Sequence, residues 1–254
     1  MTSLLVHLDG DILRVTINRP EKRNPLSREV LAALRQAFDS HRSQDVRLAI
    51  VTAAGSKNFA AGGDLRELDA VRTRPEAEGF SDEAHAALDA IRRFPQPVIA
   101  AINGDAIGGG AELAVACDIR LMAAHARIGF IQGRLNISTA WGGGPDLMRL
   151  VGPARALSLL CRSTMLTGPE AVALGLAEAV CPDAEDFPAF VDAFAAPMRR
   201  QTRLVLRAFK AQSIAARFGL PREGCRQVER DFFSQTWMHE DHWSAAARAL
   251  APAR

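Results

Sequence analysis

Two glycine-centred segments constrain this chain of 254 residues more than any other feature. Residues 59–65 read FAAGGDL, and residues 103–113 read NGDAIGGGAEL. In each segment an apolar run leads into glycines and then into residues that favour a helix, which predicts a strand, a turn and a helix start. Each segment can therefore aim a backbone N–H group from its helix start into a common cavity.

The second segment adds a carboxylate, Glu112, three residues after Gly109. On a helix this spacing places both residues on one face, a single turn apart. Two convergent N–H donors can form an oxyanion hole, which stabilises negative charge that develops on a carbonyl oxygen. One rigid element can thus supply both an N–H donor and a proton-handling acid.

The composition is that of an ordinary globular protein, with 48% hydrophobic and 24% charged residues. A formal net charge of +2 gives no electrostatic reason to expect nucleic acid or a membrane as a partner. The N-terminal residues lack the basic start and apolar run of a signal peptide, so we expect a cytoplasmic protein. The four cysteines form no CxxC pair and the histidines are dispersed, so we expect no metal site.

The first part of the chain alternates between strand and helix patterns. Residues 4–8 and 12–17 predict a hairpin, Ser27 predicts a helix cap, and residues 47–52 predict a further strand. The polar and charged residues 72–81 predict a mobile loop. This alternation is typical of an α/β fold in which helices cover a sheet.

The pattern changes near Pro197, after which almost every residue fits a helix. We therefore divide the chain into an α/β core, residues 1–196, and a C-terminal helical region, residues 197–254. The alternative, in which these helices pack on the same core, remains open.

Four motifs in order give the chain a resemblance to the enoyl-CoA hydratase/isomerase superfamily, also called the crotonase superfamily. They are NRPEKRNPLS at residues 18–27, the two glycine segments within 59–65 and 97–118, and LTGPEA with GLA at 166–177. The resemblance implies a spiral of ββα turns with C-terminal helices that assemble a homotrimer or hexamer. It also implies an acyl-CoA thioester substrate and no metal or redox cofactor.

The resemblance also carries site residues over by position. The N–H groups of Gly63 and Gly109 would be the oxyanion donors. The residues implied for coenzyme A are Ala61, Asp64 and Leu65 around the adenine, and Lys22 and Arg23 near the phosphates. The chain departs from the family at its end, where Ala249 and Pro252 stand in place of an aromatic residue and a lysine that contact CoA on a neighbouring subunit.

A hydratase of this family uses two glutamates, and only the first has a match, Glu112. The second position, within residues 128–136, holds Gln132. An amide can orient water but cannot give or take a proton, and a positioned acid or base contributes about 10²–10⁴-fold to rate. The substitution therefore disfavours ordinary hydration.

The same substitution suits decarboxylation of a malonyl-type thioester, which needs no base. One carboxylate and an amide repel an anionic substrate less than two carboxylates do. Residues 108–122 and the Trp-Gly-Gly at Trp141 are similar to the ethylmalonyl-CoA decarboxylase family. Trp141 would border the acyl pocket, or would be a core aromatic residue.

Three hypotheses follow for the chemistry. The first is an acyl-CoA lyase with enolate chemistry, with decarboxylation favoured over hydration. The second is an enoyl-CoA isomerase in which Glu112 alone shuttles a proton. The third is a non-catalytic acyl-CoA-binding protein, against which the retention of Glu112 and both glycine segments argues.

Overall fold

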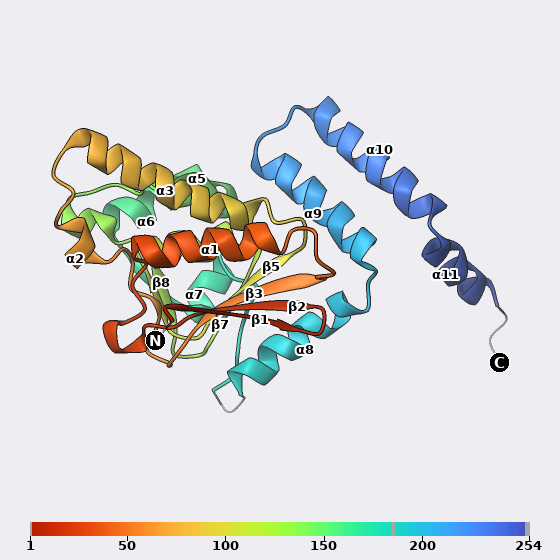
Figure 1. Ribbon diagram of the computed structural model, residues 1–254, viewed down its shortest axis with the longest axis horizontal. Coiled ribbons are helices and arrows are strands. Elements are labelled where there is room, and N and C mark those ends of the chain that lie inside the picture. The colour runs from red at the N-terminus through yellow and green to blue at the C-terminus, as the bar shows by residue number, and fades with distance from the viewer. Residues whose placement is uncertain (1, 184–185, 252–254) are drawn as a thin grey trace.

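The computed structural model describes residues 2–183 and 186–251, and it has two sheets surrounded by helices (Figure 1). The larger sheet has the strand order β1-β2-β3-β5-β7-β10, with β1 antiparallel to β2 and the other neighbours parallel. Its strands are β1 (Leu4–Asp9), β2 (Ile12–Ile17), β3 (Leu48–Ala53), β5 (Val98–Ile102), β7 (Ile119–Met122) and β10 (Ala179–Val180). The predicted hairpin and the predicted third strand are confirmed.

The smaller sheet has the order β4-β6-β8-β9. Its strands are β4 (Asn58–Ala60), β6 (Asp105–Ile107), β8 (Arg127–Gly129) and β9 (Met165–Thr167). The chain visits the two sheets in turn, since β3 leads to β4, β5 to β6, and β7 to β8. Each visit ends in a helix, so the expected spiral of ββα turns is present.

Local sequence signals account for where several of the helices begin. Ser27 caps α1 by accepting a hydrogen bond from the N–H of Val30 at 3.3 Å, as predicted. The helices are α1 (Arg28–Ser40), α2 (Leu65–Leu68), α3 (Arg74–Arg92), α4 (Gly109–Ala116), α5 (Gly143–Val151), α6 (Pro153–Arg162), α7 (Gly168–Ala173), α8 (Phe187–Arg199), α9 (Arg203–Arg217), α10 (Arg222–Met238) and α11 (Glu240–Leu250), with 3₁₀ turns η1 (Pro20–Lys22) and η2 (Gln132–Leu135).

Both faces of the central strands β3 and β5 are buried, which explains their continuous apolar character, whereas the edge strand β1 is mostly exposed. Along β3, Ala49 and Val51 join the main core with α1 and α3, whereas Leu48 and Ile50 face the opposite side. There α8 covers the sheet with residues that include Val191. The central strands are thus enclosed between two helical layers.

The prediction of a mobile loop at residues 72–81 is wrong, because α3 begins at Arg74. Thr73 and Glu76 form a capping box, in which each side chain accepts a hydrogen bond from the other's backbone N–H, and Pro75 lies in the first turn of the helix. The segment is polar because this part of α3 is exposed. The spacing of Thr73 and Glu76 was the signal that would have predicted the helix.

The part of the chain expected to be helical, from residue 197 onward, is helical through α9, α10 and α11, and both α8 and α9 are attached to the core. The predicted boundary at Pro197 lies inside α8. On α9 the buried Lys210 pairs with Asp118, with Nζ–Oδ distances of 2.6 and 2.5 Å. Burial lowers the pKa of Lys210, and the adjacent Asp118 counteracts this.

The last two helices, α10 and α11, extend away from the body of the molecule (Figure 1). They contain no buried residue among those described. Pro252, one of the two positions at which the chain departs from the family, lies outside the described residues. Within residues 2–183 and 186–251, none of the helices has both the length and the apolar character that crossing a bilayer requires.

Candidate active site

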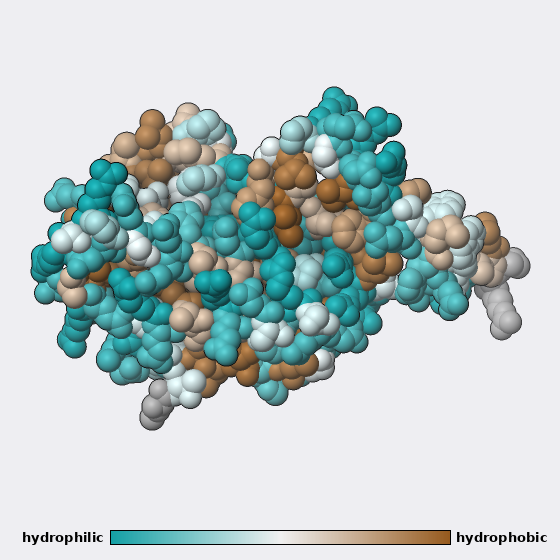
Figure 2. Space-filling model, turned by 45° about the horizontal axis from the view of Figure 1, so that its top comes forward, coloured by the Kyte–Doolittle hydropathy of each residue, from teal (hydrophilic) through white to brown (hydrophobic). Residues whose placement is uncertain are grey.

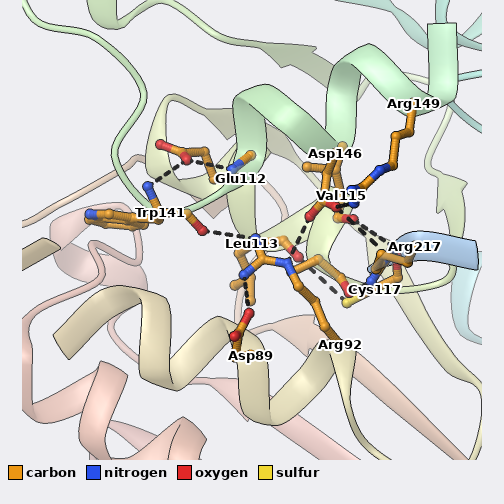
Figure 3. Close-up of polar contacts among 12 residues, drawn as sticks. Asp89, Arg92, Glu112, Leu113, Val115, Cys117, Trp141, Asp146, Arg149 and Arg217 are labelled. Atoms are coloured by element: carbon orange, nitrogen blue, oxygen red, sulfur yellow. Dashed lines mark hydrogen bonds and ion pairs between the residues drawn. The ribbon is translucent and has the colours of Figure 1, made fainter. Parts of the chain in front are cut away.

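The carboxylate of Glu112 lies at the centre of the candidate site (Figure 3). Its helix, α4, begins at Gly109, so the predicted one-turn spacing is confirmed. The backbone N–H groups of Trp141 and Gly143 both donate to Oε2 of Glu112 at 2.9 Å. The Nε2 of Gln132 donates to Oε1, also at 2.9 Å. Glu112 is only 2% exposed, so these three donors fix the position of its carboxylate.

Two opposing effects act on the charge of Glu112. Burial raises the pKa of its carboxyl group, and this is the largest effect. Hydrogen bonds from the backbone of Gly143 and Trp141 favour the anion and lower the pKa, but they only partly offset burial. Gly143 is the first residue of α5, so the helix N-terminus also favours a negative charge here. The result is a carboxyl group that keeps its proton more readily than an exposed glutamic acid.

Gln132, on η2, is the second functional side chain beside Glu112. It is 9% exposed, and its amide nitrogen is used by Glu112. Its buried Oε1 atom has no hydrogen-bond partner among the described residues. Leaving a buried acceptor unpaired costs about 1–3 kcal/mol, so this oxygen would favour a bound group that donates a hydrogen bond.

The two glycine segments lie in direct backbone contact. A Cβ atom at Gly62, whose φ is +95°, would lie 3.1 Å from the carbonyl oxygen of Ile107 and 3.5 Å from the nitrogen of Gly109. A Cβ at Gly110 would lie 2.1 Å from the carbonyl oxygen of Ala60. Only glycine permits this approach, so the two turns can share one cavity.

The indole of Trp141 packs over both predicted oxyanion donors. A Cβ at Gly63 would lie 3.6 Å from the ring, and one at Gly109 only 2.2 Å from its Cζ3 atom. Within the described part of the chain, the N–H groups of Gly63 and Gly109 find no hydrogen-bond acceptor. The structure therefore brings together Gly63, Gly109, Glu112, Gln132 and Trp141. Trp141 is 5% exposed and belongs to the hydrophobic core as well as to the site.

The residues predicted to contact coenzyme A lie along the neighbouring loop. Lys22 and Arg23 are exposed, and neither has an ion-pair partner among the described residues. The N–H of Ala61 donates to the carbonyl of Arg23 at 3.2 Å, which ties the basic turn to the first glycine segment. Leu65 is 60% exposed at the start of α2.

Asp64 has a structural role that the sequence did not reveal. Its carboxylate pairs with Arg19 at 3.0 Å and also caps α2 by accepting from the N–H of Arg66 at 3.3 Å. It therefore fixes the turn that contains Gly63. Across residues 2–183 and 186–251, histidine, cysteine and acidic side chains form no group of three or more that could hold a metal ion.

The sequence analysis did not identify two buried residues that pack against the turn whose N–H groups bind Glu112. Arg92 and Asp146 are 3% and 4% exposed and form an ion pair at 2.7 Å (Figure 3). A signal existed, because Arg92 lies four residues after Leu88 and thus on the apolar face of α3. A charged residue on such a face predicts a buried partner, but the sequence does not identify it.

We expect Gly143→Ala to destabilise the protein by about 1–3 kcal/mol, as overpacked cores generally do. A Cβ at Gly143 would lie 2.3 Å from Cγ of Glu112, which cannot move away without losing its donors. Urea denaturation measures the change. The matched control is Gly79→Ala on α3, where a Cβ meets nothing within 4 Å. That change should raise stability by up to about 1 kcal/mol. Equal stability of Gly143→Ala and the unmodified protein would contradict the tight fit.

Comparisons with known proteins agree with this geometry. The family model for enoyl-CoA hydratase/isomerase matches residues 8–248. The chain is 33% identical over 242 residues to a crotonyl-CoA hydratase of Syntrophomonas wolfei, covering 94% of this chain and 91% of that protein. It is 36% identical over 201 residues to a putative enoyl-CoA hydratase/isomerase of Bacillus subtilis, covering 76% of each.

Among solved structures, the enoyl-CoA hydratase of Bacillus anthracis superposes with a TM-score of 0.89 at 27% identity. The match covers 99% of this chain and 98% of that one. Sequence and fold therefore agree over nearly the whole length, and the chain belongs to the enoyl-CoA hydratase/isomerase family.

Proposed function

We propose that this protein decarboxylates a malonyl-type acyl-CoA thioester. The observation that carries the proposal is that the site presents one buried carboxyl group, Glu112, whose neighbour is the neutral amide of Gln132. Decarboxylation needs no base to start, and it needs an acid at the end. Glu112, with its raised pKa, suits the acid role.

The reaction has two steps. The bond between the α-carbon and the carboxylate breaks, carbon dioxide leaves, and the electron pair forms a thioester enolate. The N–H groups of Gly63 and Gly109 would stabilise the negative oxygen. Glu112 then gives its proton to the α-carbon and recovers a proton from solvent. The position of Gly109 supports its role as an oxyanion donor, because it is the first residue of α4 and a helix N-terminus favours negative charge.

The surroundings of the site favour loss of the substrate's carboxylate group as carbon dioxide. The buried Trp141 indole makes this part of the site apolar, and a carboxylate placed against it loses hydration. With Gln132 at the second position, the substrate meets one fewer like charge. Lys22 and Arg23 would attract the phosphates of coenzyme A, and the backbone near Ala61, with Asp64 and Leu65, would border its adenine.

Hydration is the second candidate, because the relatives of this chain include proteins named crotonyl-CoA hydratase and short-chain-enoyl-CoA hydratase. In that case Glu112 would serve as both base and acid, and Gln132 would only orient the water. Isomerisation of an enoyl-CoA would use the same single carboxylate.

A panel of three substrates separates these functions. We expect methylmalonyl-CoA to give the highest kcat/KM, followed by crotonyl-CoA and a 3-enoyl-CoA.

Two variants test the roles of the site residues. Glu112→Gln should lower the turnover number about 10²–10⁴-fold, because it removes the proton donor. Gln132→Glu should increase crotonyl-CoA hydration, since it rebuilds a pair of carboxylates. It should weaken methylmalonyl-CoA binding most at low salt, where added negative charge is least screened. Efficient hydration by the unmodified protein, unchanged by Gln132→Glu, would overturn the proposal.

We also propose that the C-terminal helices assemble copies of the chain into a trimer or hexamer. α10 and α11 carry large exposed hydrophobic residues, and Figure 2 shows hydrophobic residues on the surface of this region. The large hydrophobic residues that α10 and α11 expose are Phe233, Trp237, Met238, Trp243 and Leu250, with exposed fractions of 44–84%. Monomers rarely expose such a group together.

Trp237→Glu should therefore shift the protein toward single chains in analytical ultracentrifugation, because a charge in a buried interface lacks compensation. Gln235→Glu adds the same charge at an exposed polar position of α10 and should leave the mass unchanged. An unmodified protein that sediments as a monomer at micromolar concentration would contradict the assembly.

A further inference from the structure

We propose that Arg92 is a positioning residue, which together with Asp146 holds the turn at residues 141–143 against Glu112. The inference rests on the proposed function only in giving Glu112 the role of proton donor. Arg92 itself does not touch the glycine segments at Gly63 or Gly109 in any hydrogen bond of the described residues.

Arg92 uses all three of its nitrogen atoms on fixed partners (Figure 3). Nη2 donates to the carbonyl of Trp141 at 2.8 Å, Nε donates to Asp146 at 2.7 Å, and Nη1 donates to Asp89 at 2.9 Å. The guanidinium is planar, so three such bonds fix its orientation. A lysine has one nitrogen and could not reproduce this arrangement.

Trp141 connects Arg92 to the carboxyl group. Its carbonyl accepts from Arg92, while its own N–H donates to Oε2 of Glu112 at 2.9 Å. The next residue, Gly142, has a φ of +84°, and a Cβ there would lie 2.8 Å from Nη2 of Arg92. Arg92 is therefore packed directly against the turn whose N–H groups hold Glu112.

Asp146 extends this support to the helix that carries Glu112. Its second carboxylate oxygen lies 3.7 Å from Nε of Arg217 on α9. Arg217 donates to the carbonyls of Val115, Ala116 and Cys117 at the end of α4, at 2.7–3.1 Å. One buried carboxylate thus helps to fix both the turn that holds the Glu112 side chain and the helix that carries its backbone.

Stability alone does not explain a buried pair at this place. Desolvation of two charges often cancels their attraction, and apolar replacements of such pairs are often neutral or stabilising. The pair lies instead where its geometry controls two of the three donors to Glu112. This placement points to orientation as its main contribution.

The charged and titratable groups around the turn define what a test must control. From α3 these are Arg92, Asp89 and His85, whose Cε1 would lie 3.1 Å from a Cβ at Gly142. From α5 there are Asp146 and Arg149, whose Nη1 lies 3.9 Å from Oδ1 of Asp146. From η2 there is the neutral Gln132, while Arg134 of the same turn donates to the carbonyl of Ser163 at 2.8 Å. At the far end of α4, the carbonyl of Cys117 receives Arg120 from β7 and Arg217 from α9.

The test replaces both members of the ion pair, in the double variant Arg92→Met with Asp146→Asn, so that neither is left without the other. Arg217 loses its contact with Asp146 but keeps its hydrogen bonds to the carbonyls at the end of α4. Infrared difference spectra recorded against pH follow the protonated carboxyl of Glu112, identified by its loss in Glu112→Gln. With the turn released, the N–H donors to the anion weaken, so the titration midpoint should rise by about one pH unit. The turnover number should fall roughly tenfold to hundredfold, with KM within about twofold, because misplacement of a catalytic group acts on the chemical step.

Arg149→Met is the matched control. Arg149 also approaches Asp146, with Nη1 3.9 Å from Oδ1, but it is exposed and has no hydrogen bond to the turn. Its midpoint and turnover should equal those of the unmodified protein. Arg92→Lys keeps the buried charge and should give intermediate values, and it serves the same test if the double variant does not fold.

An unchanged midpoint and an unchanged turnover number in a folded Arg92 variant would overturn the proposal. Turnover is measured with whichever of methylmalonyl-CoA or crotonyl-CoA the unmodified protein consumes. The infrared titration needs no substrate. If the protein does not decarboxylate methylmalonyl-CoA, the titration midpoint of Glu112 still tests the role of Arg92. The two proposals can therefore fail separately.

Discussion

The hydrogen bonds between Glu112 and the start of α5 are the interaction on which the rest of the site depends. They join the first turn of α4 to the N–H groups of Trp141 and Gly143, so two helices from successive turns of the spiral meet at one carboxylate. The contact requires glycine at position 143, because a Cβ there would lie 2.3 Å from Glu112. It also places Trp141 over both glycine segments, which gives the site its apolar wall.

The charges at the two ends of α4 follow from the same arrangement. At its C-terminal end, the carbonyl of Cys117 accepts from both Arg120 and Arg217, which complements the negative end of the helix dipole. Burial among neighbours such as Asp118 raises the pKa of the Cys117 thiol to about 12, so it stays a neutral core group. Its N-terminal end, at Gly109, is left to interact with negative charge in the site. The helix is therefore oriented electrostatically as well as packed.

Much of this could be predicted from the sequence because it depends on local signals. Hydrophobic residues that recur every two residues predicted strands, and those that recur every three to four residues predicted helices. Ser27 predicted the start of α1, and the second glycine segment predicted that Glu112 lies one helical turn after Gly109. The helix at residues 74–81 was missed because its polar composition concealed the capping box of Thr73 and Glu76. The bond from Arg92 to Trp141 could not be predicted, since it spans 49 residues and depends on how α3 and α5 pack.

The central claim is that a single carboxyl group, held in one orientation, delivers the proton to the enolate. The stereochemistry of decarboxylation in D₂O tests it most directly. Methylmalonyl-CoA should give propionyl-CoA with deuterium in one configuration at the α-carbon, because Glu112 is fixed on one side of the site by its three donors. Glu112→Gln should lose this preference along with most of the turnover. A racemic product from the unmodified protein, or the same configuration from Glu112→Gln at an equal rate, would contradict the account.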